Sequence, residues 1–523
     1  MSSLLSEPAP TSGSAAPGAN GPADAPHSRD AGDTGYAKHL KNRHIQMIGI
    51  GGAIGSGLFL GSAGRLHEAG PSLIFSYAIC GAVAMIVVRA LGEMVLHRPS
   101  SGAFVSYSRE FIGEKAAYAA GWFHFINWGF TVIADSTAIA GFLIFWKPIS
   151  DALPQWALAL LALTIVLVIN LIGVKWFGEM EFWFSIIKVV TIIAFMFVSI
   201  FFIVTSKDLS SDGQHATAGL HNITDSGFFP NGVSPMFMLM SGVIFAYASM
   251  ELIGVAAGET ENPREVMPKA ARAVVWRILV FYIGTITLMT LLLPTDQYKK
   301  GESPFVTVLD RVGFHIGGVH MADIMSVVLI SAVASSMNSG LYSTGRVLRS
   351  MAMAGTAPRY LAKMSKTQVP YWGIFTTFAF GLIGVGINYA WPSDAFEMVL
   401  ELATLGIIGV WSIILISHLM MVRKAKRGEL ERPDFKLKGA PFLNIFGLLF
   451  MAAVLLLIMF GDDPKAAKAV YIGGPVLAAL MVGGWFLVRG RINSEAFDDE
   501  ASRMQLTGNA HAAASAAWPS TRP

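Results

Sequence analysis

The chain has 523 residues, of which 53% are hydrophobic and 14% are charged, whereas soluble proteins carry roughly 25% charged residues. A water-soluble fold cannot hide this much apolar surface, so the composition excludes an ordinary soluble globular protein. The formal net charge of +3 gives no indication of a nucleic-acid partner, and the single cysteine, Cys80, excludes an intrachain disulfide and a thiolate metal cluster. We expect no metal and no cofactor.

The chain begins with a segment, residues 1–40, that is rich in Pro, Ala, Gly and Ser and has no apolar centre. This composition predicts a disordered tail and not a cleaved signal, and residues 491–523 form a second polar tail. Between them, residues 41–490 hold apolar blocks long enough to cross about 30 Å of hydrocarbon as helices. Strict alternation is absent, so the predicted fold is an all-α polytopic membrane domain and not a β-barrel.

Twelve transmembrane spans are predicted from these blocks. Their approximate limits are 46–66, 72–96, 118–146, 155–172, 181–204, 235–258, 274–293, 321–345, 371–391, 399–421, 442–460 and 469–488. An even number places both termini on one side of the membrane. Basic residues such as Arg98, Arg264 and Arg423 gather in the loops on that side, which predicts that both tails are cytoplasmic.

The first span contains an unusual glycine cluster, IGIGGAIGSGLFLG. Glycine costs up to about 1 kcal/mol in a helix interior, so the cluster predicts either a break in the helix or close helix packing. The GxxxG spacings Gly51–Gly55 and Gly57–Gly61 favour the packing alternative. A second interrupted span would favour the break, and the sixth span supplies a candidate in SGVIFAYASMELIG.

Spans one and six each begin a group of five helices, about 46–204 and 235–421. Two interrupted helices in equivalent positions are typical of a 5+5 inverted repeat that binds its substrate at the bilayer midplane, with residues 442–488 as two peripheral helices. The helix start in span one would bind a carboxylate with its backbone N–H groups, and span six would offer carbonyl oxygens to an ammonium group. The residues predicted to bind the two ends are Ala53, Ile54, Gly55, Ser56 and Gly57 in span one, and Phe245, Ala246, Tyr247 and Ala248 in span six.

Three ionisable residues lie well inside apolar blocks: Asp135, Lys188 and Glu251. Each costs about 2.5 to 3.5 kcal/mol on insertion scales, so each needs a partner, a wet cavity or a function. Buried structural pairs are the alternative explanation for any one of them. Desolvation disfavours the charged form of a lysine, so a buried lysine can release its proton more readily. Lys188 is therefore predicted to bind and release the transported proton. Glu251 is predicted to contact substrate, whereas Asp135 is either a pocket residue or structural.

Several stretches resemble the amino acid permeases of the amino acid, polyamine and organocation superfamily, and within it the bacterial L-asparagine permeases. They are NRHIQMIGIGGAIGSGLFLG from Asn42, RALGEMVLHRPSSGAFVSYSREFIGEKAAYAAGW from Arg89, GVKWFGEMEFWFSIIK from Gly173, FAYASMELIGVAAGE from Phe245 and MNSGLYSTGRVLRSMA from Met337. The resemblance implies a LeuT-like twelve-helix fold in the bacterial cytoplasmic membrane. It also implies that Lys188 occupies the place of the coupling ion in sodium-dependent relatives, and that Glu251 is the acidic residue of span six.

These observations predict a secondary active transporter that imports a neutral L-amino acid, L-asparagine above all, by proton symport and alternating access. An amino acid exchanger and a sodium-coupled symporter remain as alternatives within the same class. A membrane-embedded enzyme or a channel is the alternative from a different class, but no Walker motif, HExxH or nucleophile elbow is found. The expected partners are an amino acid, protons and the lipid bilayer. No enzymatic activity is expected.

Overall fold

We analysed a computed structural model of the chain. It describes residues 54–492 except 101, 211–213, 255–262, 314, 317–318, 366–368, 394, 462–466 and 468. For residues 174–176, 263, 315–316, 319 and 469 it describes the backbone alone. Ala53, one of the predicted site residues, and both predicted tails therefore lie outside the described residues, apart from 491 and 492.

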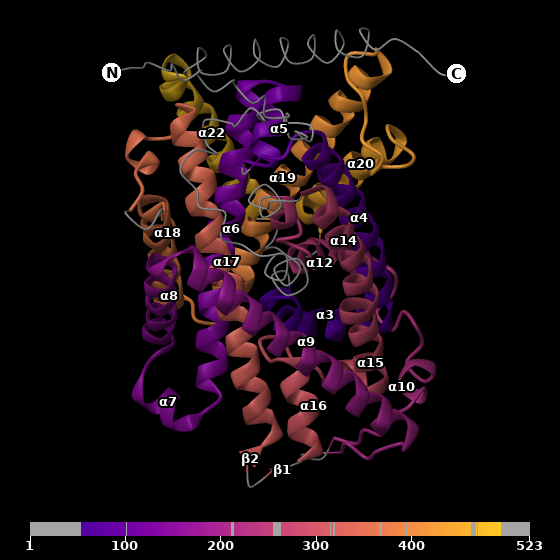
Figure 1. The fold of residues 1–523 in the computed structure, drawn as a ribbon. Helices are drawn as coiled ribbons and strands as arrows, with labels where there is room; N and C mark the ends of the chain where they lie inside the picture. Colours follow the sequence, from indigo (N-terminus) through magenta and orange to yellow (C-terminus); the bar gives the residue numbers. More distant parts are fainter. Residues whose placement is uncertain are drawn as a thin grey trace, which may run out of the picture. The chain divides into compact units, whose positions relative to one another are not determined.

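The described part of the chain is almost entirely helical, with ten segments long and apolar enough to cross a membrane (Figure 1). These segments are Gly61–His97, Glu114–Ile144, Gln155–Ile172, Phe177–Val204, Arg264–Leu292, Met321–Met353, Tyr371–Ala390, Ala395–Lys426, Phe442–Phe460 and Val470–Arg491. The prediction of an all-α membrane protein is confirmed at this level.

The helices differ widely in length, from single turns to more than thirty residues. The α-helices are α2 (Ser56–Phe59), α3 (Gly61–Ala69), α4 (Leu73–His97), α5 (Phe104–Phe111), α6 (Glu114–Ile144), α7 (Lys147–Ala152), α8 (Gln155–Ile172), α9 (Val174–Val204), α10 (His221–Thr224), α11 (Ser234–Met238), α12 (Met240–Ala246), α14 (Pro263–Trp276), α15 (Thr285–Leu292), α16 (Pro304–Val312), α17 (Met321–Met353), α18 (Tyr371–Ala390), α19 (Ala395–Lys426), α20 (Phe442–Phe460) and α22 (Gly474–Val488). Short 3-10 turns cover Gly70–Ser72, Thr295–Gln297, Arg359–Ala362 and Arg489–Arg491, and π-helical turns cover Arg277–Gly284 and Ala469–Gly473. One two-stranded hairpin, β1 (His315–Ile316) with β2 (Val319–His320), precedes α17.

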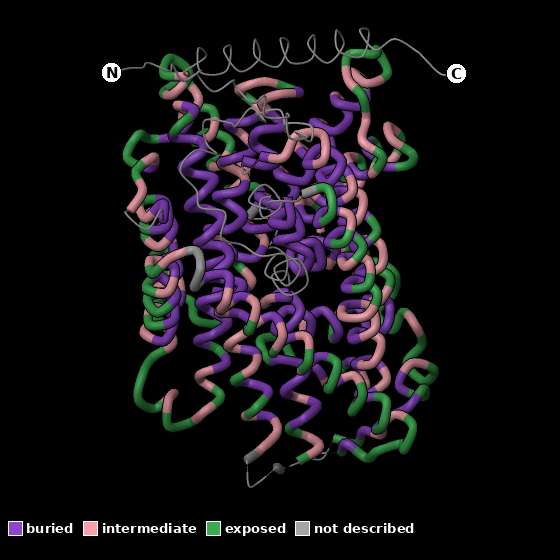
Figure 2. The backbone as a smooth tube through the Cα atoms, in the orientation of Figure 1, coloured by how far each residue is buried: buried purple, intermediate pink, exposed green. Residues whose placement is uncertain are grey.

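The long helices α6 and α17 form the centre of the bundle. They pack against each other, and α6 also packs along α19. Figure 2 shows buried residues concentrated on these central helices, while exposed residues follow the outer ones. Helix α22 contains no buried residue, and α9 exposes large apolar side chains such as Phe197 and Phe201. Apolar outer faces of this kind suit contact with lipid.

Helical structure is interrupted in the sixth predicted span, and in the described part of the first a helix begins inside the predicted span. The described part of span one begins with the non-helical Ile54 and Gly55, and a helix starts at Ser56. In span six, α12 ends at Ala246, residues 247–251 are not helical, and helix resumes at residue 252. Ser249 in this break has a φ of +75°, in the left-handed region. The break predicted for span six is thus present.

Candidate functional site

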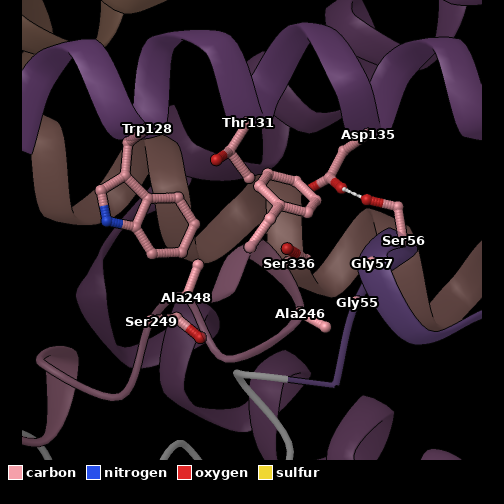
Figure 3. Close-up of a pocket in the computed structure, with 11 residues that line it drawn as sticks. Gly55, Ser56, Gly57, Trp128, Thr131, Asp135, Ala246, Ala248, Ser249 and Ser336 are labelled. Carbon is pink, nitrogen blue, oxygen red and sulfur yellow. Dashed lines mark hydrogen bonds between the residues drawn. The ribbon is translucent and has the colours of Figure 1, made fainter. Parts of the chain in front are cut away.

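A small pocket lies where the start of α2, the end of α12 and the middle of α6 meet (Figure 3). The space between its walls that no atom fills is about 260 Å³, part of it open to solvent. The lining residues are Gly55, Ser56, Gly57, Trp128, Thr131, Asp135, Phe245, Ala246, Ala248, Ser249 and Ser336.

The start of α2 forms one wall of this pocket. Gly55 precedes the helix, and its carbonyl accepts hydrogen bonds from the N–H groups of Leu58 and Phe59, both at 3.2 Å. The first N–H groups of a helix have no partner within it, and they carry the positive end of the helix dipole. Gly57 is needed for the close approach of α12, because a Cβ added there would lie 2.7 Å from the Ala246 Cα. The wall is therefore formed largely by backbone.

Asp135 reaches the same wall from α6. Its Oδ1 accepts a hydrogen bond of 2.6 Å from the Ser56 hydroxyl, and the whole residue is buried (Figure 3). Ser336 on α17 interacts with the same carboxylate. Nevertheless, Oδ2 makes no hydrogen bond with any described residue. Oδ1 is thus held by a hydrogen bond to α2, whereas Oδ2 can still accept a hydrogen bond.

The end of α12 forms the opposite wall, and its carbonyl groups are partly used by the protein. The Phe245 carbonyl accepts from the Ala248 N–H at 3.0 Å, and the Ala246 carbonyl accepts from the Tyr282 hydroxyl at 2.9 Å. Tyr247 points away from the pocket, where its hydroxyl donates to the Tyr77 carbonyl at 2.9 Å. Its ring lies 4.6 Å from that of Tyr282. Tyr77, Tyr247 and Tyr282 thus form an aromatic cluster that packs against the break on the side away from the pocket.

Glu251 lies beyond the pocket lining but is connected to it. The carboxylate accepts from Asn127 Nδ2 at 3.4 Å and from Trp411 Nε1 at 3.3 Å. Asn127 in turn accepts from the hydroxyl of Thr131, a pocket residue, through its backbone carbonyl at 2.8 Å. Glu251 is therefore linked to the lining residue Thr131 through Asn127, and it also interacts with Trp128 in the lining.

Lys188 lies in a second polar cluster, between α9 and α17. Its Nζ donates to the Ser335 hydroxyl at 2.9 Å, and Ser335 Oγ lies 2.8 Å from each carboxylate oxygen of Glu181. All three residues are fully buried. The lysine ammonium also interacts electrostatically with Asp135. Ser335 faces this cluster while its neighbour Ser336 lines the pocket, so one turn of α17 joins the two sites.

The predicted site residues thus separate into three groups. Gly55, Ser56, Gly57, Asp135, Phe245, Ala246 and Ala248 line the pocket, whereas Ile54, Tyr247 and Glu251 are buried outside its lining, and Lys188 lies in the adjoining cluster. Sequence reasoning missed Trp128, Thr131, Ser249 and Ser336 in the lining and Glu181 beside Lys188. Glu181 stands seven residues before Lys188, a spacing that places both on one helix face. Among the described residues, no group of acidic, His or Cys side chains could hold a metal ion.

A bundle of many apolar helices, with a small pocket at a helix start and at an interrupted helix, is the architecture of an integral membrane protein that handles a small molecule. The chain belongs to the amino acid permease family, whose model matches residues 44–496. It is a permease and not an enzyme.

Named relatives are similar over most of their length. The chain is 53% identical to an L-asparagine permease of Streptomyces coelicolor, over 89% of this chain and 94% of the relative. It is 49% identical to L-asparagine permeases of Salmonella typhimurium and Escherichia coli, in each case over 88% of this chain and 91% of the relative.

Proposed function

We propose that the protein imports L-asparagine by proton symport with alternating access, through the pocket between α2, α6 and α12. The observation that carries this proposal is the junction on α17, where Ser335 bonds to the buried Lys188 and the next residue, Ser336, lines the pocket. Protonation of Lys188 and binding of substrate in the pocket would then both affect the same turn of α17. Alternating access would follow from movement at that turn.

The substrate is an α-amino acid in this proposal because the pocket offers complementary groups at its two helix ends. The carboxylate binds at the N–H groups of Ser56 and Gly57, and the ammonium group lies toward the end of α12 near Phe245, Ala246 and Ala248. The hydroxyl groups of Thr131 and Ser336 can both donate and accept, as a carboxamide requires. The names of relatives that are about half identical favour L-asparagine.

Glu251 and Lys188 have different parts in the proposed mechanism. Glu251 supports the substrate site from behind, through Asn127 and Thr131. Lys188 takes up and releases the coupled proton, since its buried ammonium is costly and is balanced by nearby acidic groups. A membrane potential of 100 mV would contribute about 2.3 kcal/mol to moving one charge, or roughly 50-fold accumulation.

The proposal includes a complete topology. We infer twelve spans, arranged as a LeuT-like 5+5 inverted repeat over about 46–204 and 235–421, followed by two peripheral helices over about 442–488. The interrupted spans one and six support this arrangement, because they begin the two halves. Residues 1–40 and 491–523 are cytoplasmic tails, and the bacterial cytoplasmic membrane is the proposed location.

The test is uptake of labelled L-asparagine into proteoliposomes with an imposed inward proton gradient, with and without a protonophore. We expect gradient-dependent accumulation of the label. Unlabelled L-asparagine should inhibit this accumulation more strongly than other amino acids do. Lys188→Met should abolish accumulation, and concentrative uptake by that variant at the wild-type rate would remove Lys188 from the coupling role.

Other outcomes would point to the alternatives. Accumulation that requires external sodium would indicate a sodium-coupled symporter, and uptake that requires internal amino acid would indicate an exchanger. Downhill flux that does not saturate would indicate a channel, and chemical conversion of the labelled compound would indicate an enzyme. Preferential competition by a different amino acid would change the substrate and leave the class of transporter intact.

A further inference from the structure

Of the described residues that line the pocket, Asp135 is the ionisable one. Its Oδ1 is satisfied by the Ser56 hydroxyl at 2.6 Å, whereas its Oδ2 has no hydrogen-bond partner among the described residues, although the residue is fully buried. A buried charged acceptor without a partner is costly, by more than the roughly 1–3 kcal/mol of a neutral group. In a pocket, such an atom can accept a hydrogen bond from a bound ligand.

The other groups available to an ammonium ion in this pocket are neutral and partly occupied. The carbonyl of Phe245 already accepts from Ala248, and that of Ala246 already accepts from Tyr282. Moving an ammonium group from water to a buried site is unfavourable unless a charge and several acceptors replace its hydration. The carbonyls at the end of α12 therefore need an anionic neighbour.

The position of Asp135 suits a compound whose carboxylate and ammonium groups are attached to the same carbon. Ser56 is both the first residue of α2 and the donor to Asp135, so the acidic group lies directly beside the helix start (Figure 3). A ligand carboxylate bound at the N–H groups of Ser56 and Gly57 places an α-ammonium group close to Asp135. A carboxylate without that ammonium would meet the negative charge of Asp135 and bring no positive charge of its own.

We propose that the free carboxylate oxygen of Asp135 binds the α-ammonium group of the substrate, so that Asp135 selects zwitterionic α-amino acids over compounds with a carboxylate alone. This role rests on the proposed function, in which the pocket takes an α-amino acid. It adds a specificity-determining contact to that site. The competing explanation is that Asp135 serves as a counterion of Lys188, with which it interacts electrostatically.

The test compares two ligands on purified full-length protein in nanodiscs by isothermal titration calorimetry. The ligands are L-asparagine and succinamic acid, which keeps the carboxylate and carboxamide but has hydrogen in place of the ammonium group. We expect Asp135→Asn to bind L-asparagine about 10- to 100-fold more weakly, the loss of one charge-assisted contact, and to bind succinamic acid as well as the wild type or better. Asp135→Ser, a smaller neutral replacement that can still accept from Ser56, should behave in the same way if the Asn variant fails to fold.

Asp323→Asn is the matched control, because Asp323 also accepts one hydrogen bond, from Trp146 Nε1 at 2.7 Å, and does not line the pocket. It should leave both affinities unchanged. Equal weakening of both ligands by the Asp135 variants, or unchanged affinity for L-asparagine together with lost proton coupling, would overturn the proposal in favour of the Lys188 counterion. Failure of the wild type to bind L-asparagine would instead contradict the proposed substrate. The same comparison would then use the amino acid that does bind and its deamino analogue.

Discussion

Glu181 and Lys188 lie seven residues apart on α9 and share one hydroxyl group, that of Ser335 on α17. The two charged side chains are therefore bridged by Ser335, a residue of a different helix. Movement of α17 relative to α9 would remove the Ser335 hydroxyl that links the two charges, both of which stay on α9. In the proposed mechanism, this shared hydroxyl would link the protonation of Lys188 to the position of α17.

Replacing Glu181 by Gln should reduce proton-driven accumulation of L-asparagine by about 10-fold or more, because Lys188 loses a nearby opposite charge. Exchange of labelled for unlabelled substrate across the membrane needs no net proton movement and should persist. Uptake and counterflow in the same proteoliposomes measure both. Glu265→Gln, at an exposed position of α14, is the control and should change neither. Equal loss of uptake and counterflow would indicate a structural role for Glu181.

Gly57→Ala should be more damaging than Gly55→Ala. The added Cβ at Gly57 would lie 2.7 Å from the backbone Cα of Ala246, which cannot move without separating α2 from α12. At Gly55 the nearest atom is the Ser336 hydroxyl oxygen at 3.0 Å, and a side chain can rotate away. We expect the first change to lower the free energy of unfolding by about 1–3 kcal/mol and to abolish transport.

Gly141→Ala provides the control for this comparison, because an added Cβ there meets nothing within 4 Å. It should be neutral or stabilising by up to about 1 kcal/mol, since Gly141 lies within helix α6. Thermal unfolding in detergent and uptake would be measured for all three variants. Equal behaviour of the Gly55 and Gly57 variants would show that the contact with α12 does not limit the site.

Glu93→Gln should destabilise the protein without acting on the pocket. The buried Glu93 carboxylate accepts from Arg432 Nε and Nη2 at 2.6 and 3.0 Å, from His418 Nε2 at 2.9 Å and from the Leu437 N–H at 2.6 Å. It thus fastens the loop between α19 and α20 to α4. Loss of its charge should cost about 2–4 kcal/mol, measured as a lower unfolding temperature in detergent.

The exposed pair Arg427–Glu429 offers a comparison in the same loop. Its nitrogen and oxygen lie 3.7 Å apart, and the two side chains are 73% and 47% exposed. Glu429→Gln should change stability by less than about 1 kcal/mol, because solvent screens the pair. A loss for Glu93→Gln no greater than for Glu429→Gln would contradict the structural role of Glu93.

Glu110 lies on the short helix α5, outside the candidate spans, and should make the stability of the protein depend on pH. Burial alone would raise the pKa of its carboxyl, but the hydrogen bond from His97 and the charge of Arg98 outweigh burial and hold the pKa below the ordinary 4.5. A carboxyl with a lowered pKa in the folded state stabilises the fold fully above its unfolded pKa, and this contribution is lost as the pH falls through the folded pKa. Unfolding temperatures between pH 7 and pH 3 should fall less steeply for Glu110→Gln than for the wild type. Parallel profiles would contradict this assignment.

The sequence was sufficient to predict the helical membrane fold and the break in span six, because hydropathy and glycine placement are local signals. It also placed Gly55, Ser56, Gly57 and Ala246 near one another through the expected pairing of the two breaks. The pocket residues of α6 and α17 could not be predicted in this way. Thr131 and Ser336 are ordinary hydroxyl residues in apolar helices, and their position depends on how those helices rotate against α2.

The buried ionisable residues show the same division between local and long-range information. Depth in an apolar block identified Asp135, Lys188 and Glu251 as unusual, but it could not indicate their partners. Glu181 was overlooked although it lies on the same helix face as Lys188, and Ser335 joins them from 154 positions further along the chain than Glu181. Contacts of that separation depend on tertiary packing, which no local pattern records.

The non-helical backbone at 247–251 has a consequence for how the transport cycle can be observed. Around this break the hydrogen bonds run from residue i to i+3, as from the Ala248 N–H to the Phe245 carbonyl, and these are weaker than those of a regular helix. Lipid cannot satisfy backbone groups, so the break must be covered by protein, substrate or water in every state. Its amide hydrogens should therefore exchange with deuterium when the cavity fills with water and be protected when substrate occupies it. Peptides covering this segment would report pocket hydration directly, with no label attached to the protein.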